Sequence, residues 1–174
     1  MNTLTRDEIK ERIKKRTVDD DVIKAINNYL NTDDLEFVLY IGINYYSGNG
    51  LPKNQKLAFN FFKFAADASF SRAIPFVAYC YRYGCGIDKD YKLALDWYKK
   101  GAELGNTSCM CKLAEEYLLG DIVEVDVKTA KMWYEKGASL GDGSCIRALN
   151  KYHWSDEYDD KDKWFRIWTK GAKW

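Results

Sequence analysis

Residues able to perform acid–base or nucleophilic chemistry are few in this 174-residue chain. A general base needs a partner that orients it and tunes its acidity. The only histidine, His153, has no such partner at a recognisable spacing. It also stands where an internal repeat has Tyr45, Tyr81 and Tyr117, so packing against a neighbouring helix accounts for it better. We therefore predict no catalytic residue and no enzyme activity.

Two glycine pairs are the nearest approach to a phosphate-binding loop. They lie at 48–50 (GNG) and 84–86 (GCG). Nucleotide-binding loops follow a strand and carry a later glycine or lysine, and both features are missing here. Turn geometry explains the pairs, and we expect no small-molecule substrate.

Metal ligands and disulfides are also not expected from the sequence. The acidic run comprises Asp156, Glu157, Asp159, Asp160 and Asp162 and lacks the ligand spacing and central glycine of an EF-hand loop. The five cysteines form no CxxC pairs. Cys109 and Cys111 point in different directions on a helix, and Cys109 and Cys145, one repeat apart, are too distant to bridge. We predict buried thiols, no metal, no cofactor and a stability independent of reductant.

The composition indicates a folded protein without a dominant charge. Hydrophobic residues make up 47%, aromatic residues 16% and charged residues 30%, which is too much core-forming material for disorder. The net charge of +1 provides no general attraction for nucleic acid or an anionic membrane. The first residues, MNTLTRDEIKERIKKR, lack the apolar core of a signal peptide. We therefore expect a cytoplasmic protein with no membrane partner.

A repeat of 36 residues organises most of the chain and must position any site. Eight positions recur in register, beginning with Tyr45, Gly48, Gly50, Lys56, Ala58, Phe61, Phe62 and Ala66. The second copy has Tyr81, Gly84, Gly86, Lys92, Ala94, Trp97, Tyr98 and Ala102. The third has Tyr117, Gly120, Ile122, Lys128, Ala130, Trp133, Tyr134 and Ala138. Because the aromatic pair recurs at one site of each copy, it predicts core packing rather than a base-stacking platform.

Each copy predicts two helices. The segments KLALDWYKKGAELG and KTAKMWYEKGASLG place apolar residues at helical spacing. An Asx residue able to cap the first turn precedes these helices, at Asn54, Asp90, Asp126 and, with a shift, Asp160. The preceding runs FVLYIGINYY, AIPFVAYCYRY and CMCKLAEEYLL are also helical in pattern. Each carries a small residue, Gly42, Ala78 or Ala114, at which a partner helix can approach closely.

The whole chain, 1–174, is predicted to be a single repeat domain. Complete repeats occupy 34–69, 70–105 and 106–141, and a shortened repeat occupies 142–174. Residues 1–33 have the pattern of a degenerate helix pair. We expect this pair to cap the stack, because a terminal unit has a neighbour on one side only.

These residues resemble the Sel1-like repeat, a relative of the tetratricopeptide repeat. The likeness is clearest in AIPFVAYCYRYGCGIDKDYKLALDWYKKGAELG and extends over residues 34 to 174. Ile122, where glycine is expected, and the fourth copy depart from the pattern. The resemblance implies an all-α fold, an α-solenoid of antiparallel helix pairs wound as a right-handed superhelix. It also implies a role in binding proteins, with the first helix of each pair on the concave face.

By analogy with the tetratricopeptide repeat, partner-binding residues lie on the first helices. They comprise Glu36, Leu39, Ile43, Tyr46, Arg72, Tyr79, Arg82, Tyr83, Cys111, Glu115, Leu118, Arg147, Lys151 and Trp154. Aromatic residues and arginine are enriched at binding hot spots, although some of these positions equally suit the core.

The leading interpretation is a non-catalytic module that binds a partner protein. One form of it is an immunity or regulatory protein that neutralises a single effector enzyme, since this small chain has no further domain to carry an activity. RNA binding is the alternative from a different functional class. It is suggested by the predicted first-helix face, which carries Arg72, Arg82, Arg147 and Lys151. The net charge of +1 weighs against RNA.

Overall fold

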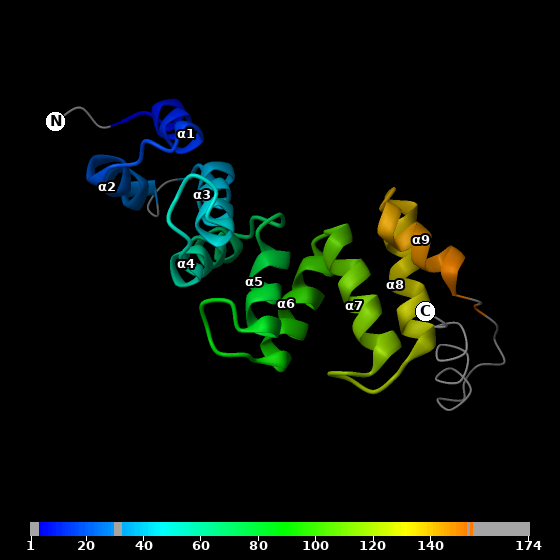
Figure 1. Cartoon of the computed structure of the whole chain (residues 1–174). Helices are drawn as coiled ribbons and strands as arrows, with labels where there is room; N and C mark the ends of the chain where they lie inside the picture. Colours follow the sequence, from blue (N-terminus) through cyan, green and yellow to red (C-terminus); the bar gives the residue numbers. More distant parts are fainter. Residues whose placement is uncertain (1–3, 30–32, 153, 155–174) are drawn as a thin grey trace, which may run out of the picture. The chain divides into compact units, whose positions relative to one another are not determined.

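All long secondary-structure elements in the part of the chain that the structure describes are α-helices. This structure is a computed structural model and describes residues 4–29, 33–152 and 154. Within those residues there are nine helices and no strand (Figure 1). They are α1 (Arg6–Lys15), α2 (Asp20–Asn28), α3 (Leu35–Ser47), α4 (Gln55–Asp67), α5 (Ile74–Tyr83), α6 (Tyr91–Glu103), α7 (Thr107–Leu119), α8 (Val127–Ser139) and α9 (Gly143–Lys151). The all-α prediction is confirmed, and none of these helices is long and apolar enough to cross a membrane.

Asx residues begin the second helices, as predicted. The backbone N–H of Leu57 donates to Asn54 at 3.0 Å, that of Leu93 to Asp90 at 2.9 Å, and that of Thr129 to Asp126 at 2.9 Å. Each bond satisfies an N–H that has no acceptor within its own helix. Asp160 lies outside the described residues, as do His153 and the acidic run.

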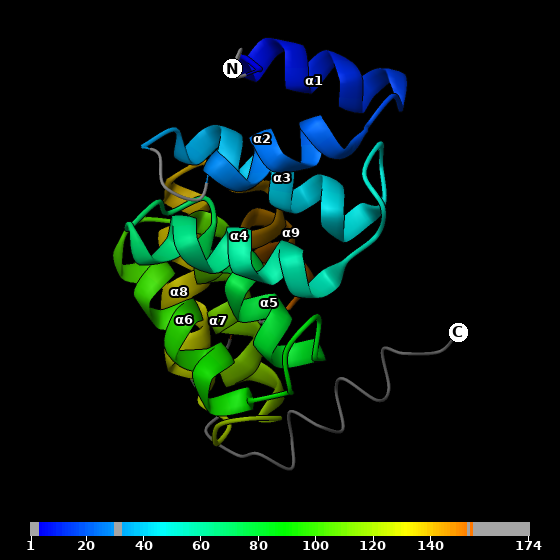
Figure 2. The ribbon, with the colours of Figure 1, turned by 90° about the vertical axis from the view of Figure 1, so that its left-hand side faces the viewer.

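The contacts of the chain divide it into two compact units, residues 1–97 and 98–174, with the boundary inside α6. In the first unit, α3 and α4 lie side by side in both views (Figures 1 and 2). Their shared core contains Ile41, Tyr45, Phe61 and Phe62, all at most 2% exposed. The rings of Tyr45 and Phe61 are stacked, with their centroids 5.8 Å apart. The predicted core role of the aromatic pair is confirmed here.

Gly42 is the point of closest approach between α3 and α4. A Cβ added to Gly42 would lie 2.7 Å from Cε1 of Phe62 and 3.1 Å from Cβ of Phe61. Real Cβ atoms essentially never come as close to another atom as 2.7 Å. The Phe62 ring therefore occupies space that glycine leaves free, which is why this repeat requires a small residue at this position.

The second unit contains a smaller core between α7, α8 and α9. Ala114, Ala130, Tyr134 and Cys145 are buried in it. Gly137 has the same role in α8 as Gly42 has in α3, because its added Cβ would meet the sulfur of Cys145 at 2.4 Å. A larger residue at either glycine would push the neighbouring helix away.

Ala78, the small residue of α5, is fully buried. We expect Ala78→Leu to lower the free energy of unfolding by about 1–3 kcal/mol, because added methyl groups in a packed core force neighbouring side chains off their rotamers. Ala68→Leu, at the exposed end of α4, is the control and should change stability little. Urea denaturation monitored by circular dichroism measures both. Equal midpoints for Ala78→Leu and the wild type would show that Ala78 is not tightly packed.

Candidate protein-binding surface

Three tyrosines form a connected aromatic group on α3 and α5 of the first unit. The rings of Tyr79 and Tyr83 lie 4.4 Å apart, and the ring of Tyr46 meets that of Tyr79 edge-on at 6.2 Å. Tyr79 is 40% exposed and Tyr83 is 51% exposed. We call Tyr46, Tyr79 and Tyr83 the tyrosine surface. It presents contiguous aromatic area to solvent.

Helical spacing positions the tyrosine surface. Tyr79 and Tyr83 are four residues apart on α5 and therefore share a face. Tyr46 reaches them from α3, and its ring packs above the buried Phe62 at 6.4 Å. Phe62 is itself stacked on Phe76 of α5 at 4.8 Å. The group thus rests on the core, so its side chains are held in place before a partner arrives.

The tyrosine surface combines hydroxyl groups with a neighbouring cation. The hydrogen bond to Tyr79, together with burial, raises the pKa of Tyr46 well above its usual value. Its hydroxyl, already neutral at physiological pH, therefore keeps its proton in alkaline solution as well. Arg82 lies beside the group, with its guanidinium 5.7 Å from the ring centroid of Tyr83 and its Nε donating to the Tyr83 hydroxyl at 3.4 Å. Aromatic rings with a hydroxyl and a neighbouring arginine combine apolar contact with hydrogen bonding, the usual composition of binding hot spots.

The other predicted residues of the first unit differ in their surroundings. Ile43 on α3 is 38% exposed and lies one turn before Tyr46. Glu36 and Arg72, both exposed, form an ion pair with each other. Their side chains are 53% and 64% exposed, so both charges stay accessible to a partner, and such an exposed pair contributes little to stability. Leu39, in contrast, is 3% exposed and belongs to the core.

The second unit carries its own group of predicted residues. Arg147 and Lys151 are exposed and four residues apart on α9. Glu115 forms an ion pair with Lys112 at 2.7 Å. Trp154 is only partly exposed, because its Nε1 donates to the carbonyl of Leu149 at 3.1 Å and its ring packs against Tyr134.

Two predicted residues of the second unit are core residues. Leu118 is 8% exposed and Cys111 is 5% exposed. Both belong to the cluster around Ala114, Ala130 and Tyr134. A partner cannot reach them without rearranging α7. Seven of the thirteen residues of α7 are buried, so the tetratricopeptide analogy alone does not separate surface from core on this helix.

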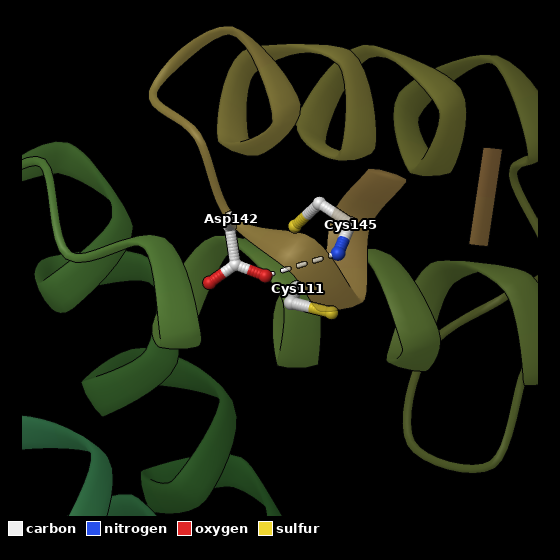
Figure 3. Close-up of side chains that lie close together, drawn as sticks. All are labelled: Cys111, Asp142 and Cys145. Carbon is white, nitrogen blue, oxygen red and sulfur yellow. Dashed lines mark hydrogen bonds between the residues drawn. The ribbon is translucent and has the colours of Figure 1, made fainter. Parts of the chain in front are cut away.

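A group of potential metal ligands was missed by the sequence analysis. Cys111, Asp142 and Cys145 come together between α7 and the start of α9 (Figure 3). The expectation that the chain binds no metal rested on the absence of CxxC pairs and did not consider this grouping; it stays a prediction. The signal in the sequence was weak: a helix-capping aspartate followed three residues later by a cysteine.

Repeated antiparallel helix pairs with recurring close-approach positions define a helical-repeat scaffold. The Sel1 repeat matches the chain three times, at residues 39–70, 73–106 and 107–142, which is more than half of its length. The chain belongs to the Sel1 repeat family. Sel1 repeats generally mediate protein–protein interactions and generally act as non-catalytic scaffolds.

Solved structures of this fold are similar to the chain. A Sel1 repeat protein from Oxalobacter formigenes is 27% identical, with a TM-score of 0.64 over 75% of this chain and 98% of that one. The protective antigen c5321 of uropathogenic Escherichia coli is 20% identical, with a TM-score of 0.67. The match covers 84% of this chain but only 35% of the antigen. Helicobacter pylori cysteine rich protein B is 17% identical, with a TM-score of 0.57 over 83% of this chain and 97% of that one. A comparison with curated proteins gives no match.

Proposed function

We propose that this protein is a non-catalytic binding module whose partner protein docks on the tyrosine surface of α3 and α5. The observation that carries the proposal is the contact between Tyr46, Tyr79 and Tyr83, two of which are 40% and 51% exposed. Exposing three connected aromatic rings to water is energetically unfavourable. A docked side chain would bury them at low entropic cost, because tyrosine has only two rotatable side-chain torsions.

The resemblance to tetratricopeptide repeats supports placing this face on the concave side of the repeat, since α3 and α5 are first helices of their pairs. Ile43, Glu36 and Arg72 would then form the polar and apolar rim around the tyrosines. Neutralising a single effector enzyme, as an immunity or regulatory protein does, is one form of this proposed role. The partner's identity distinguishes it from a scaffold.

The test compares partner retention by three forms of the full chain. Tyr79→Ala/Tyr83→Ala should weaken binding by about 2 kcal/mol or more, roughly a 30-fold rise in Kd, because anchoring aromatics carry that much at interface centres. Tyr91→Ala is the matched control, since Tyr91 is also an exposed tyrosine (50%) but lies outside the tyrosine surface. Arg82 is left intact, because it is partly buried and its replacement would not separate an effect on binding from one on folding.

The measurement has two stages. The wild type first captures its partner from a nuclease-treated lysate of the native host, and mass spectrometry identifies the retained protein. Calorimetry then gives Kd for each variant with that purified protein. Wild-type affinity in a folded Tyr79→Ala/Tyr83→Ala variant would refute this binding surface. A parallel capture from the untreated lysate is the comparison, and retention that is seen there but is lost in the nuclease-treated lysate would instead support the RNA-binding alternative.

A further inference from the structure

Three potential metal ligands converge in the second unit. One is the sulfur of Cys111 on α7, the second is a carboxylate oxygen of Asp142 at the start of α9, and the third is the sulfur of Cys145 in the first turn of α9 (Figure 3). These three atoms all lie within 4.8 Å of one another. Cys145 is fully buried, Cys111 is 5% exposed, and Asp142 is partly exposed. The donors therefore sit at the edge of a core, with the carboxylate on the solvent side.

The local fold holds each donor in position. Asp142 caps α9, and one of its oxygens accepts from the backbone N–H of Ser144 at 2.8 Å and from that of Cys145 at 3.0 Å. Figure 3 shows the bond from Cys145. Gly137 on α8 makes room for the Cys145 sulfur, which lies 2.4 Å from the place where a Cβ of residue 137 would be. Cys111 is fixed by the packing of α7. Three different local constraints thus hold the donor atoms within 4.8 Å of one another.

The carboxylate charge of Asp142 suits the uptake of a cation, whereas each neutral thiol must give up a proton to bind it. Burial alone would raise the pKa of Asp142, but hydrogen bonds from the Cys145 amide, the Thr107 hydroxyl and the Ser144 amide hold it below its usual value. Asp142 is therefore a carboxylate at neutral pH. Burial raises the pKa of Cys111 and of Cys145, so both thiols are protonated when no cation is bound.

We propose that Cys111, Asp142 and Cys145 form a binding site for a borderline-soft divalent cation of the Zn²⁺ class. Two sulfur donors and one carboxylate oxygen are ligands that Zn²⁺ accepts, whereas Mg²⁺ and Ca²⁺ require oxygen donors. In a tetrahedral zinc site the donor atoms lie roughly 3.5–4 Å apart. Closure around the cation thus needs only a small movement, and a water molecule on the solvent side of Asp142 completes the four ligands.

Binding releases protons in a balanced exchange. The cation forms bonds to two sulfurs and one oxygen, and each thiol loses its proton to the solvent, so two protons leave for each cation bound. The net charge of the site stays at −1, because the two positive charges of the cation replace those of the two protons. The buried core therefore gains no net charge, and affinity should rise with pH.

The test uses the reduced full chain and Co²⁺, whose bonds to thiolates give a charge-transfer absorption band. We expect one Co²⁺ per chain to produce this band and an excess of Zn²⁺ to abolish it. Cys145→Ala and Cys111→Ser should each lose the band. Cys109→Ala is the matched control and should retain it, because Cys109 is an equally buried thiol of α7 outside the cluster.

Asp142→Asn tests the carboxylate separately from the fold. Asparagine caps a helix as well as aspartate does, so α9 should persist while affinity for Co²⁺ falls at least about 10-fold. Zn²⁺ should also raise the melting temperature of the wild type and of Cys109→Ala, but not that of Cys145→Ala. The absence of a charge-transfer band in the wild type, or its persistence in Cys145→Ala, would overturn the proposal. So would the finding that air oxidation joins Cys111 to Cys145 while added Zn²⁺ neither binds nor protects them.

Discussion

Gly86→Ala should lower the free energy of unfolding by at least ~3 kcal/mol. Gly86 has a φ of +80°, a conformation in which a side chain is strained. Its added Cβ would also lie 2.2 Å from the carbonyl oxygen of Gln55 and 2.7 Å from the amide nitrogen of Lys56. These are backbone atoms of α4 and cannot rotate away, so the loop after α5 must move as a whole.

Gly105→Ala separates the two causes of the destabilisation expected for Gly86→Ala, which are the strained backbone and the contact with α4. Gly105 has a nearly identical φ of +81°, but an added Cβ would meet nothing within 4 Å. Gly105→Ala should therefore lower the free energy of unfolding by only about 1 kcal/mol, because only the left-handed backbone conformation is strained. Denaturant unfolding of both variants gives the difference. If they lost the same stability, contact between this loop and α4 would not matter to the fold.

The repeat spacing was sufficient to predict the turn glycines, the helix-starting Asx residues and the small residues at close approaches. These are local requirements, and they recur because each copy solves the same packing problem. The third copy shows the limit. Ile122 replaces the glycine that corresponds to Gly86, and among the described residues only Arg16 and Ser69 are non-glycine residues with positive φ. Its loop therefore takes another backbone path, which the pattern could not specify. The predicted capping role of residues 1–33 stays a prediction.

The candidate sites were less predictable, because they depend on which side of each helix is covered. Tyr79 and Tyr83 were assigned to the surface from repeat position and lie there, yet Leu39 was chosen by the same rule and is buried. The metal cluster joins residues 31 and 34 positions apart in sequence, whereas the repeat period is 36. No motif marks such a contact. It arises from the packing of α7 against the start of the next repeat.

The largest loss of stability is expected from Phe62→Ala, which should cost about 3–5 kcal/mol. Phe62 is 1% exposed, stacks on Phe76 and fills the space above Gly42. Removing its ring deletes contacts to both α3 and α5 and leaves a cavity at their junction with α4. Thermal and urea unfolding measure the loss, and a cost below about 1 kcal/mol would mean that the helices collapse to close the cavity.

Gly42→Ala, made both in the wild type and in the Phe62→Ala variant, tests whether the Phe62 ring is the reason that residue 42 must be small. In the wild type the new Cβ would lie 2.7 Å from the Phe62 ring, so this change should destabilise although alanine favours a helix by about 1 kcal/mol over glycine. In the Phe62→Ala background the ring is gone, and the same change should be neutral or stabilising. The double-mutant cycle should therefore give a coupling energy of at least about 1 kcal/mol. Additive effects would contradict the interpretation that a small residue on α3 is needed because an aromatic ring of α4 takes its space.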